Sequence, residues 1–490
     1  MKNAKFYVIF LVCGLLAGCS LSPSSSSAKK TGSGDPLAIY QDNLIPEYDP
    51  ILKKMNTATR YRIGLNIPDS ITDINGHMTV AYTNNEKVTL DTVYFRMFPN
   101  VSGDYMTVSN LLVDGASVPV NVEYLNTALR VDLPSPLKPG KSVEISMDFN
   151  QTVPTEMGGN YGLYIYLDDI LALDQFFPII PVYDDEGWNV EDPPINADMV
   201  FTDEAFFEVS VDAPGDLVLA GSGIESSSSE ENGRQQVTYI GGPQRDFFLA
   251  GSANFVVSQT QAGETTIRSF YPAQYSEAGE MVLETAAYAV EGFDKRFGDY
   301  PYTELDVIST PMSAGGMEYS TAVTLSVAFY DPDYADGILA FLESAAAHEV
   351  GHQWFFNQVM SDQLEEPWLD EGLVQYATYL YYVDRYGPSR AQGVSASWYE
   401  RWYRVGGSTI PIGKAAGEYS QTEYSAIVYG RGPLFFAALE DQMGEEQFNE
   451  LLYDYAEKYR WAISTGADFK ALAEETCACD LTALFDEWVY

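Results

Sequence analysis

The sequence predicts a multidomain β plus α/β protein, with an N-terminal antiparallel β domain and a C-terminal α+β domain rich in helices. Apolar and polar residues alternate over residues 58–272, and Pro, Gly, Asn and Asp separate the alternating runs. Near residue 275 the apolar period changes to that of helices. The chain has 490 residues, of which 46% are hydrophobic, so two cores can be buried.

The first 18 residues are expected to be a lipoprotein signal peptide. Lys2 and Lys5 accompany an apolar run at 6–17, which is too short to span a membrane as a stable helix. The run ends in Leu16-Ala-Gly-Cys19, which resembles a bacterial lipoprotein cleavage box. We therefore expect cleavage before Cys19 and a diacylglyceryl group on its sulfur, with an ordinary secretory signal as the alternative. Lipid would then anchor the protein to the cell membrane, on the extracellular or periplasmic side.

Three further segments follow the signal peptide. Residues 19–36 are rich in Ser and are expected to be a flexible tether. The β domain is expected over 37–265 and the α+β domain over 266–490. Within the second domain we expect helices at 278–297, 338–360 and 368–386, and strands at 302–310 and 321–329.

The charge balance excludes nucleic acid as a partner. The chain has 70 Asp and Glu against 27 Lys and Arg, a formal net charge of -43. Nucleic acid is bound by clustered Lys and Arg. An acidic surface serves solubility or tolerance of salt, and it attracts cationic peptides or metal ions.

Two cysteines remain in the folded part, Cys477 and Cys479, one residue apart. No His lies near them in the sequence, so they are a poor zinc site. We expect a structural role, either as buried thiols or as a local disulfide.

The strongest chemical signal is His348-Glu-Val-Gly-His352, within the helix expected at 338–360. Residues four apart lie on one face of a helix, so both imidazoles can reach one metal ion. Glu349 would lie beside the metal, where it can take a proton from a water molecule. The chain has only 3 His, so two of them coming together by chance in this pattern is improbable.

A third ligand is expected from Glu371, in Trp368-Leu-Asp-Glu-Gly372. It follows His352 after 18 residues, and an antiparallel neighbouring helix would bring it back to the metal. This pattern resembles the gluzincin aminopeptidases of the aminopeptidase N type. The resemblance implies a thermolysin-like catalytic domain with one Zn²⁺ per chain, held by His348, His352 and Glu371.

Gly315-Gly316-Met317-Glu318-Tyr319 resembles a second motif of that family, Gly-x-Met-Glu-Asn. The resemblance implies a strand that binds the substrate backbone, and a carboxylate, Glu318, that binds the free α-amine of the substrate. Tyr319 stands where Asn is usual.

Tyr429, in Tyr429-Gly-Arg-Gly432, resembles the catalytic tyrosine of the same family. Its phenol would donate a hydrogen bond to the oxyanion. Two residues have more open roles. Gln175 would contact the end of the substrate, and Glu366 would support the metal site or be a solvated surface acid. The short sequence after Gly372 implies that the large helical C-terminal domain of the family is absent.

These observations predict a lipid-anchored zinc aminopeptidase that acts on peptides with free N-termini. An endopeptidase on the same scaffold is one alternative. A non-catalytic surface lipoprotein with a structural zinc is another, although Glu349 would then have no use.

Overall fold

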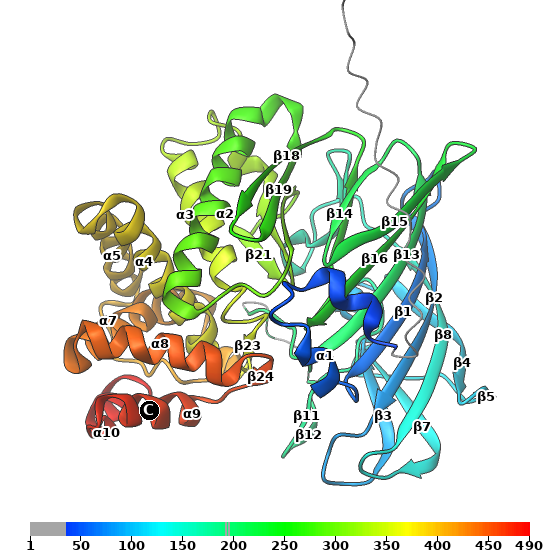
Figure 1. The fold of residues 1–490 in the computed structure, drawn as a ribbon, viewed down its shortest axis with the longest axis horizontal. Helices are drawn as coiled ribbons and strands as arrows, with labels where there is room; N and C mark the ends of the chain where they lie inside the picture. The colour runs from blue at the N-terminus through cyan, green and yellow to red at the C-terminus, as the bar shows by residue number, and fades with distance from the viewer. Residues whose placement is uncertain (1–35, 192–193, 195–196) are drawn as a thin grey trace, which may run out of the picture.

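The computed structural model describes residues 36–191, 194 and 197–490 (Figure 1). The expected signal peptide, Cys19 and the tether up to residue 35 lie outside these residues. Among the residues that are described, no helix combines the length and the apolar character that crossing a membrane requires.

An eight-stranded sheet dominates the N-terminal part, in the order β15-β16-β13-β1-β2-β8-β4-β5. Every second residue of its central strands is buried, as the alternation predicts. Neighbours are antiparallel except β1 and β13, which run parallel. The strands are β1 (Thr59–Asn66), β2 (Asp73–Thr83), β4 (Met106–Val113), β5 (Ala116–Ser117), β8 (Ser142–Thr152), β13 (Ala205–Pro214), β15 (Ile224–Glu231) and β16 (Arg234–Gln244).

A three-stranded sheet packs against the large sheet and closes the first core. Phe95 and Val131 of this sheet share a hydrophobic cluster with Ile145 and Phe149 of the large one. The N-terminal part therefore has a core of its own. The small sheet consists of β3 (Leu90–Arg96), β7 (Ala128–Leu137) and β6 (Asn121–Glu123), and the hairpin of β11 (Tyr183–Asp184) and β12 (Gly187–Trp188) is a separate two-stranded sheet that packs against the same core.

A third sheet joins the N-terminal part to the C-terminal part, which begins at Phe255. We call this second part the catalytic part, because it contains the zinc motif expected from the sequence. It consists of β14 (Val218–Gly221), β17 (Leu249–Ser252), β10 (Ile170–Leu173) and β9 (Tyr164–Leu167). Phe248 and Ala250 pack in one cluster with Ile308 and Tyr319 of the catalytic part. The two parts therefore share buried apolar surface, which fixes one against the other.

The sheet of the catalytic part has five strands, in the order β18-β19-β20-β22-β21. They are β18 (Phe255–Ala262), β19 (Thr265–Pro272), β20 (Glu304–Thr310), β22 (Ala322–Ser326) and β21 (Gly316–Tyr319). The expected boundary at 265/266 falls within the hairpin of β18 and β19, so this pairing moves the boundary to the turn before Phe255. Alternation reveals a strand but not the sheet that it joins, so the sequence could not place this hairpin.

Helices cover this sheet and extend away from the large sheet (Figure 1). Helices α2 and α3 pack on the five strands. The longer helices are α2 (Ser276–Phe297), α3 (Ile338–Gly351), α4 (Leu373–Tyr386), α5 (Pro388–Trp402), α7 (Gly432–Met443), α8 (Glu445–Tyr459) and α9 (Gly466–Cys477). Shorter ones are α1 (Pro50–Lys54), α6 (Gln421–Ala426) and α10 (Thr482–Trp488).

Helix α3 ends at Gly351, whereas the sequence predicted a helix up to residue 360. His352 is its C-terminal cap residue, and the chain then turns through backbone hydrogen bonds from Gln353 to Val350 and from Trp354 to Gly351. The indole of Trp354 donates to the backbone oxygen of Gly298. The apolar run thus continues into the core without remaining helical.

Two π-helical turns each precede a helix directly. They are η6 (Trp368–Gly372), before α4, and η9 (Ile427–Arg431), before α7.

Cys477 and Cys479 form a disulfide at the end of α9. Neither residue is buried, so the local-disulfide alternative is the one that the structure confirms. The remaining short elements are η1 (Ala38–Asn43), η2 (Phe98–Val101), η3 (Asn160–Gly162), η4 (Ala273–Tyr275), η5 (Val327–Tyr330), η7 (Tyr403–Val405), η8 (Ala416–Glu418), β23 (Val359–Met360) and β24 (Ala462–Ile463).

Candidate active site

The three expected metal ligands meet between α3 and the π-helical turn η6. His348 Nε2 lies 3.0 Å from Glu371 Oε2 and 3.2 Å from His352 Nε2. His352 Nε2 lies 3.6 Å from the same oxygen of Glu371. The three side chains are buried, so their ligand atoms form a small triangle that is shielded from bulk water.

This triangle has the dimensions that zinc requires. A tetrahedral ion with ligands at about 2.0–2.1 Å has ligand-to-ligand edges of about 3.3–3.4 Å, and the observed separations span 3.0–3.6 Å. Two imidazoles and one carboxylate without a thiolate are a zinc donor set that leaves a fourth position open. Burial lowers the pKa of His348, which favours the neutral imidazole that binds a metal.

Neighbouring side chains orient each ligand. His352 Nδ1 lies 2.8 Å from Asp370 Oδ1, and His348 Nδ1 lies 3.3 Å from the amide nitrogen of Gln375. Such partners fix the ring and its tautomer, and they usually matter nearly as much as the ligands. Neither Asp370 nor Gln375 was singled out from the sequence, although Asp370 lies next to Glu371 in the motif.

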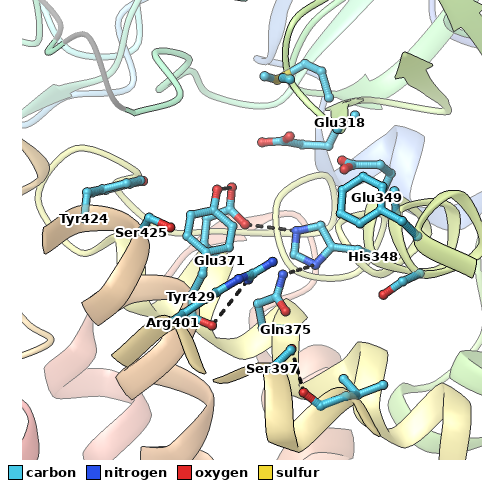
Figure 2. A pocket seen from close by; sticks show the side chains of 18 of the residues that line it. Glu318, His348, Glu349, Glu371, Gln375, Ser397, Arg401, Tyr424, Ser425 and Tyr429 are labelled. Atoms are coloured by element: carbon cyan, nitrogen blue, oxygen red, sulfur yellow. Dashed lines mark hydrogen bonds and ion pairs between the residues drawn. The ribbon is translucent and has the colours of Figure 1, made fainter. Parts of the chain in front are cut away.

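Glu349 lies one residue after the first ligand, and its carboxylate lines the same cleft (Figure 2). Burial raises the pKa of Glu349 to about 8, and the charge of His352 opposes this shift. The side chain of Glu349 occupies the space that a side chain at position 316 would need. Gly316 therefore has a packing role beside the base, in addition to its place in the strand.

Glu318 lies on β21, which is the edge strand of the five-stranded sheet. Gly315, Gly316, Met317 and Glu318 all line the cleft, as the motif predicts. The amide of Gln363 donates to Glu318 Oε1 over 2.8 Å, and it also donates to Asp370 Oδ2 over 2.7 Å. Glu318 is thus linked through one amide to the residue that orients His352. Burial, followed by the nearby charge of Asp198, holds its pKa well above the usual value.

Tyr429 completes the expected set from the π-helical turn η9. Its hydroxyl donates to Glu371 Oε1, so the phenol lies at the metal site. The guanidinium carbon of the neighbouring Arg401 lies 5.6 Å from the centre of the Tyr429 ring. Single π-helical turns inside helices occur frequently at functional sites, and here two of them carry Glu371 and Tyr429.

Two residues with open roles remain, Gln175 and Glu366, and neither lines the cleft that contains Glu349. Gln175 is buried and donates to Asp246 Oδ2 over 3.0 Å, although it borders a small cavity beside Glu318. Glu366 accepts a hydrogen bond from the backbone nitrogen of Gly466 at the start of α9, so it caps a helix and does not support the metal site. Asp198, which the sequence did not single out, lines both the cleft and this small cavity.

His348, Glu349, Glu371, Glu318 and Tyr429 line one cleft of about 730 Å³. The expected metal ligands His348 and Glu371, the expected base Glu349, and an edge strand that carries Glu318 thus lie together, as the resemblance to the gluzincin aminopeptidases implies. Residues 281–488 match the model of the peptidase family M1 domain. This stretch, which is less than half of the chain, is therefore similar to the domain of peptidase family M1.

Curated relatives are distant and longer. Aminopeptidase 2 of Candida albicans is 25% identical over 302 residues, which are 58% of this chain and 32% of that protein. Aminopeptidase M1-C of Oryza sativa subsp. japonica is 23% identical over 422 residues, which are 78% of this chain and 45% of that protein. The chain thus spans about a third to about half of the length of these relatives.

The fold is that of a solved M1 zinc metallopeptidase from Deinococcus radiodurans. That structure superposes with a TM-score of 0.65 at 21% identity and covers 89% of this chain and 94% of its own. A further structure of the same protein, bound to a Tyr-Ser-Ala substrate, has a TM-score of 0.65 at 20% identity and covers 88% and 94% of the two chains. The likeness extends over both the β part and the catalytic part.

Proposed function

We propose that this protein is a zinc aminopeptidase that removes residues from the N-termini of peptides. One observation carries the proposal. The buried carboxylate of Glu318 lies on an edge strand, in the same cleft as Glu349 and two of the three expected metal ligands, His348 and Glu371. An edge strand pairs with an extended peptide, and a carboxylate at its end binds an ammonium group. An endopeptidase has no use for such a carboxylate.

The chemistry follows from the positions of the side chains. Zinc, when bound by His348, His352 and Glu371, polarises the scissile carbonyl and lowers the pKa of a water molecule. Glu349 accepts the proton of the attacking water and passes it to the leaving amine. The hydroxyl of Tyr429 donates a hydrogen bond to the oxyanion that forms.

The test is a panel of aminoacyl reporters, assayed with and without a strong chelator. We expect turnover that the chelator abolishes and that added zinc restores. Full activity in protein shown to contain no metal would contradict the proposal. Zinc-dependent cleavage confined to substrates with blocked N-termini would favour the endopeptidase, and bound zinc without any turnover would favour the non-catalytic lipoprotein.

We propose further that a lipid on Cys19 anchors the protein to the membrane, on its extracellular or periplasmic side. The motif Leu16-Ala-Gly-Cys19 after a basic and apolar start supports this. The test is Cys19→Ala with an otherwise unchanged chain. We expect the wild type in the membrane fraction and the variant outside it with equal zinc content, and equal partition of both would contradict the anchor.

A further inference from the structure

The cleft has a basic wall opposite to its acidic one, and this wall comes from a single helix face. Positions 390, 394, 397, 401 and 404 of α5 and η7 all line the cleft. Their spacing of four, three, four and three residues places them on one face of a helix. Three of the five are arginines, namely Arg390, Arg401 and Arg404, and the two between them are the smaller Val394 and Ser397.

These arginines differ from Arg268 and Arg296, which carboxylates hold in place. Arg268 bonds to Asp306 and Arg296 bonds to Asp384. Within the described parts of the chain, none of the three cleft arginines forms an ion pair with a carboxylate. In a chain with 70 acidic and 27 basic residues, the two arginines on neighbouring turns, Arg401 and Arg404, with Arg390 about 16 Å further along the same helix face, offer guanidinium groups that can bind an anion.

The position of this wall relative to Tyr429 indicates which part of a substrate it would meet. Figure 2 shows Glu318 at one end of the pocket and Arg401 beside Tyr429 at the other, with His348 and Glu371 between them. Arg401 Nη1 donates a long hydrogen bond of 3.5 Å to the backbone oxygen of Tyr429. A peptide whose amine is bound by Glu318 and whose carbonyl faces Tyr429 therefore continues toward the arginines.

The charges of the arginines point to the same conclusion. Burial, together with the nearby positive charge of Arg404, lowers the pKa of Arg401. Like charges three positions apart on one helix face repel each other, and an anion bound between them would relieve that repulsion. The cleft is thus acidic where a peptide amine would bind and basic where the rest of the peptide would follow.

We propose that the arginine face of α5 and η7 binds a carboxylate on the C-terminal side of the scissile bond. The favoured substrates are then short peptides with a free C-terminus, or peptides with an acidic side chain after the bond. This inference rests on the proposed aminopeptidase function and names the substrate class within it. An Arg–carboxylate contact is frequently bidentate, which gives both affinity and orientation.

The test uses trialanine, its C-terminal amide, the amide of Ala-Glu-Ala, and an alanyl p-nitroanilide reporter that carries no carboxylate. We expect the wild type to cleave trialanine with a kcat/KM about 10-fold or more above that of its amide, mainly through KM, since the carboxylate is bound equally before and during the reaction. A value for the Ala-Glu-Ala amide near that of trialanine would extend recognition to acidic side chains. A value near that of the trialanine amide would restrict it to the C-terminus.

Arg404→Gln and Arg390→Gln should lower the ratio of kcat/KM for trialanine to that for its amide, and they should leave kcat/KM for the reporter unchanged. Arg401→Gln should lower this ratio most. Arg62→Gln is the matched control, because it removes the same charge from an exposed site of the β part. Equal cleavage of acid and amide by the wild type would overturn the inference, and so would equal loss on every substrate in all three variants. Failure of the proposed function is a distinct result, since it would appear as no zinc-dependent turnover of the reporter.

Discussion

At the scale of single residues, the position of Glu349 depends on the absence of a side chain at Gly316. A Cβ atom at 316 would lie 2.4 Å from Glu349 Oε1 and 2.6 Å from its Cδ and Cγ. Such contacts are impossible without movement of the carboxylate. Gly316 of the edge strand β21 and Glu349 of helix α3 therefore pack directly against each other, although 33 positions separate them in the sequence.

We expect Gly316→Ala to lower kcat by about 10–100-fold, because a displacement of about 1 Å at a reacting group has costs of this order. Zinc content should not change, since the three atoms nearest to a Cβ at position 316 all belong to Glu349, which is not one of the expected ligands. Gly292→Ala is the control, because a Cβ there would meet nothing within 4 Å. The measurement is steady-state kinetics with metal analysis, and an unchanged kcat would contradict the packing argument.

Glu349→Gln separates chemistry from metal binding. The amide keeps the size of the side chain but accepts no proton, so we expect turnover to fall by at least about 100-fold with zinc still bound. The control is Glu291→Gln, an exposed glutamate of α2. Loss of zinc in Glu349→Gln would make Glu349 structural, and a retained rate would require a different base.

The residues that the sequence could predict are those linked by a spacing rule. His348 and His352 follow from helix geometry, and Glu318 follows from its motif. Asp198 and Arg401 could not be predicted, because a segment of the β part and a helix with no recognised motif bring them to the cleft. No rule of spacing connects either residue with the metal ligands.

At the scale of elements, the site depends on where helices and strands end. His352, an expected ligand, is the cap residue directly after the end of α3, and Glu371 and Tyr429 come from π-helical turns. The sequence predicted the helices that surround the site, because apolar period and capping glycines are local signals. It overestimated the length of α3, since Trp354, Phe355 and Phe356 continue the apolar pattern after the helix has ended.

At the scale of the whole molecule, Arg245 connects the β part to the catalytic part. It follows β16, and its guanidinium pairs with Glu204 at 2.9 Å while both side chains are buried. The same group donates to the backbone oxygens of Thr202, Asn357 and Ala462. Asn357 follows the zinc helix, so this one side chain joins the β part to the support of the metal site.

We expect Arg245→Met to lower the free energy of unfolding by about 3–5 kcal/mol, because it leaves the buried carboxyl group of Glu204 and three backbone oxygens without their partner. The double variant Arg245→Met with Glu204→Met should recover the part of this loss that comes from Glu204, since the buried carboxyl group is then absent, while the three backbone oxygens still lack their donor. Arg62→Gln, at an exposed ion pair, should change stability by less than about 1 kcal/mol. Denaturation midpoints are the measurement, and a single variant as stable as the wild type would refute this role.

The central claim is that Glu318 makes this enzyme an aminopeptidase by binding the substrate amine. The most direct measurement is kcat/KM on one peptide in two forms, with a free and with an acetylated N-terminus, for the wild type, Glu318→Ala and the control Glu400→Ala. A charge-assisted hydrogen bond is worth roughly 1.5–3 kcal/mol, so Glu318→Ala should lose about 10–150-fold on the free peptide. On the acetylated peptide, already a poor substrate, it should lose little, and Glu400→Ala should match the wild type on both. Equal cleavage of the two forms by the wild type would contradict the claim and leave the endopeptidase standing.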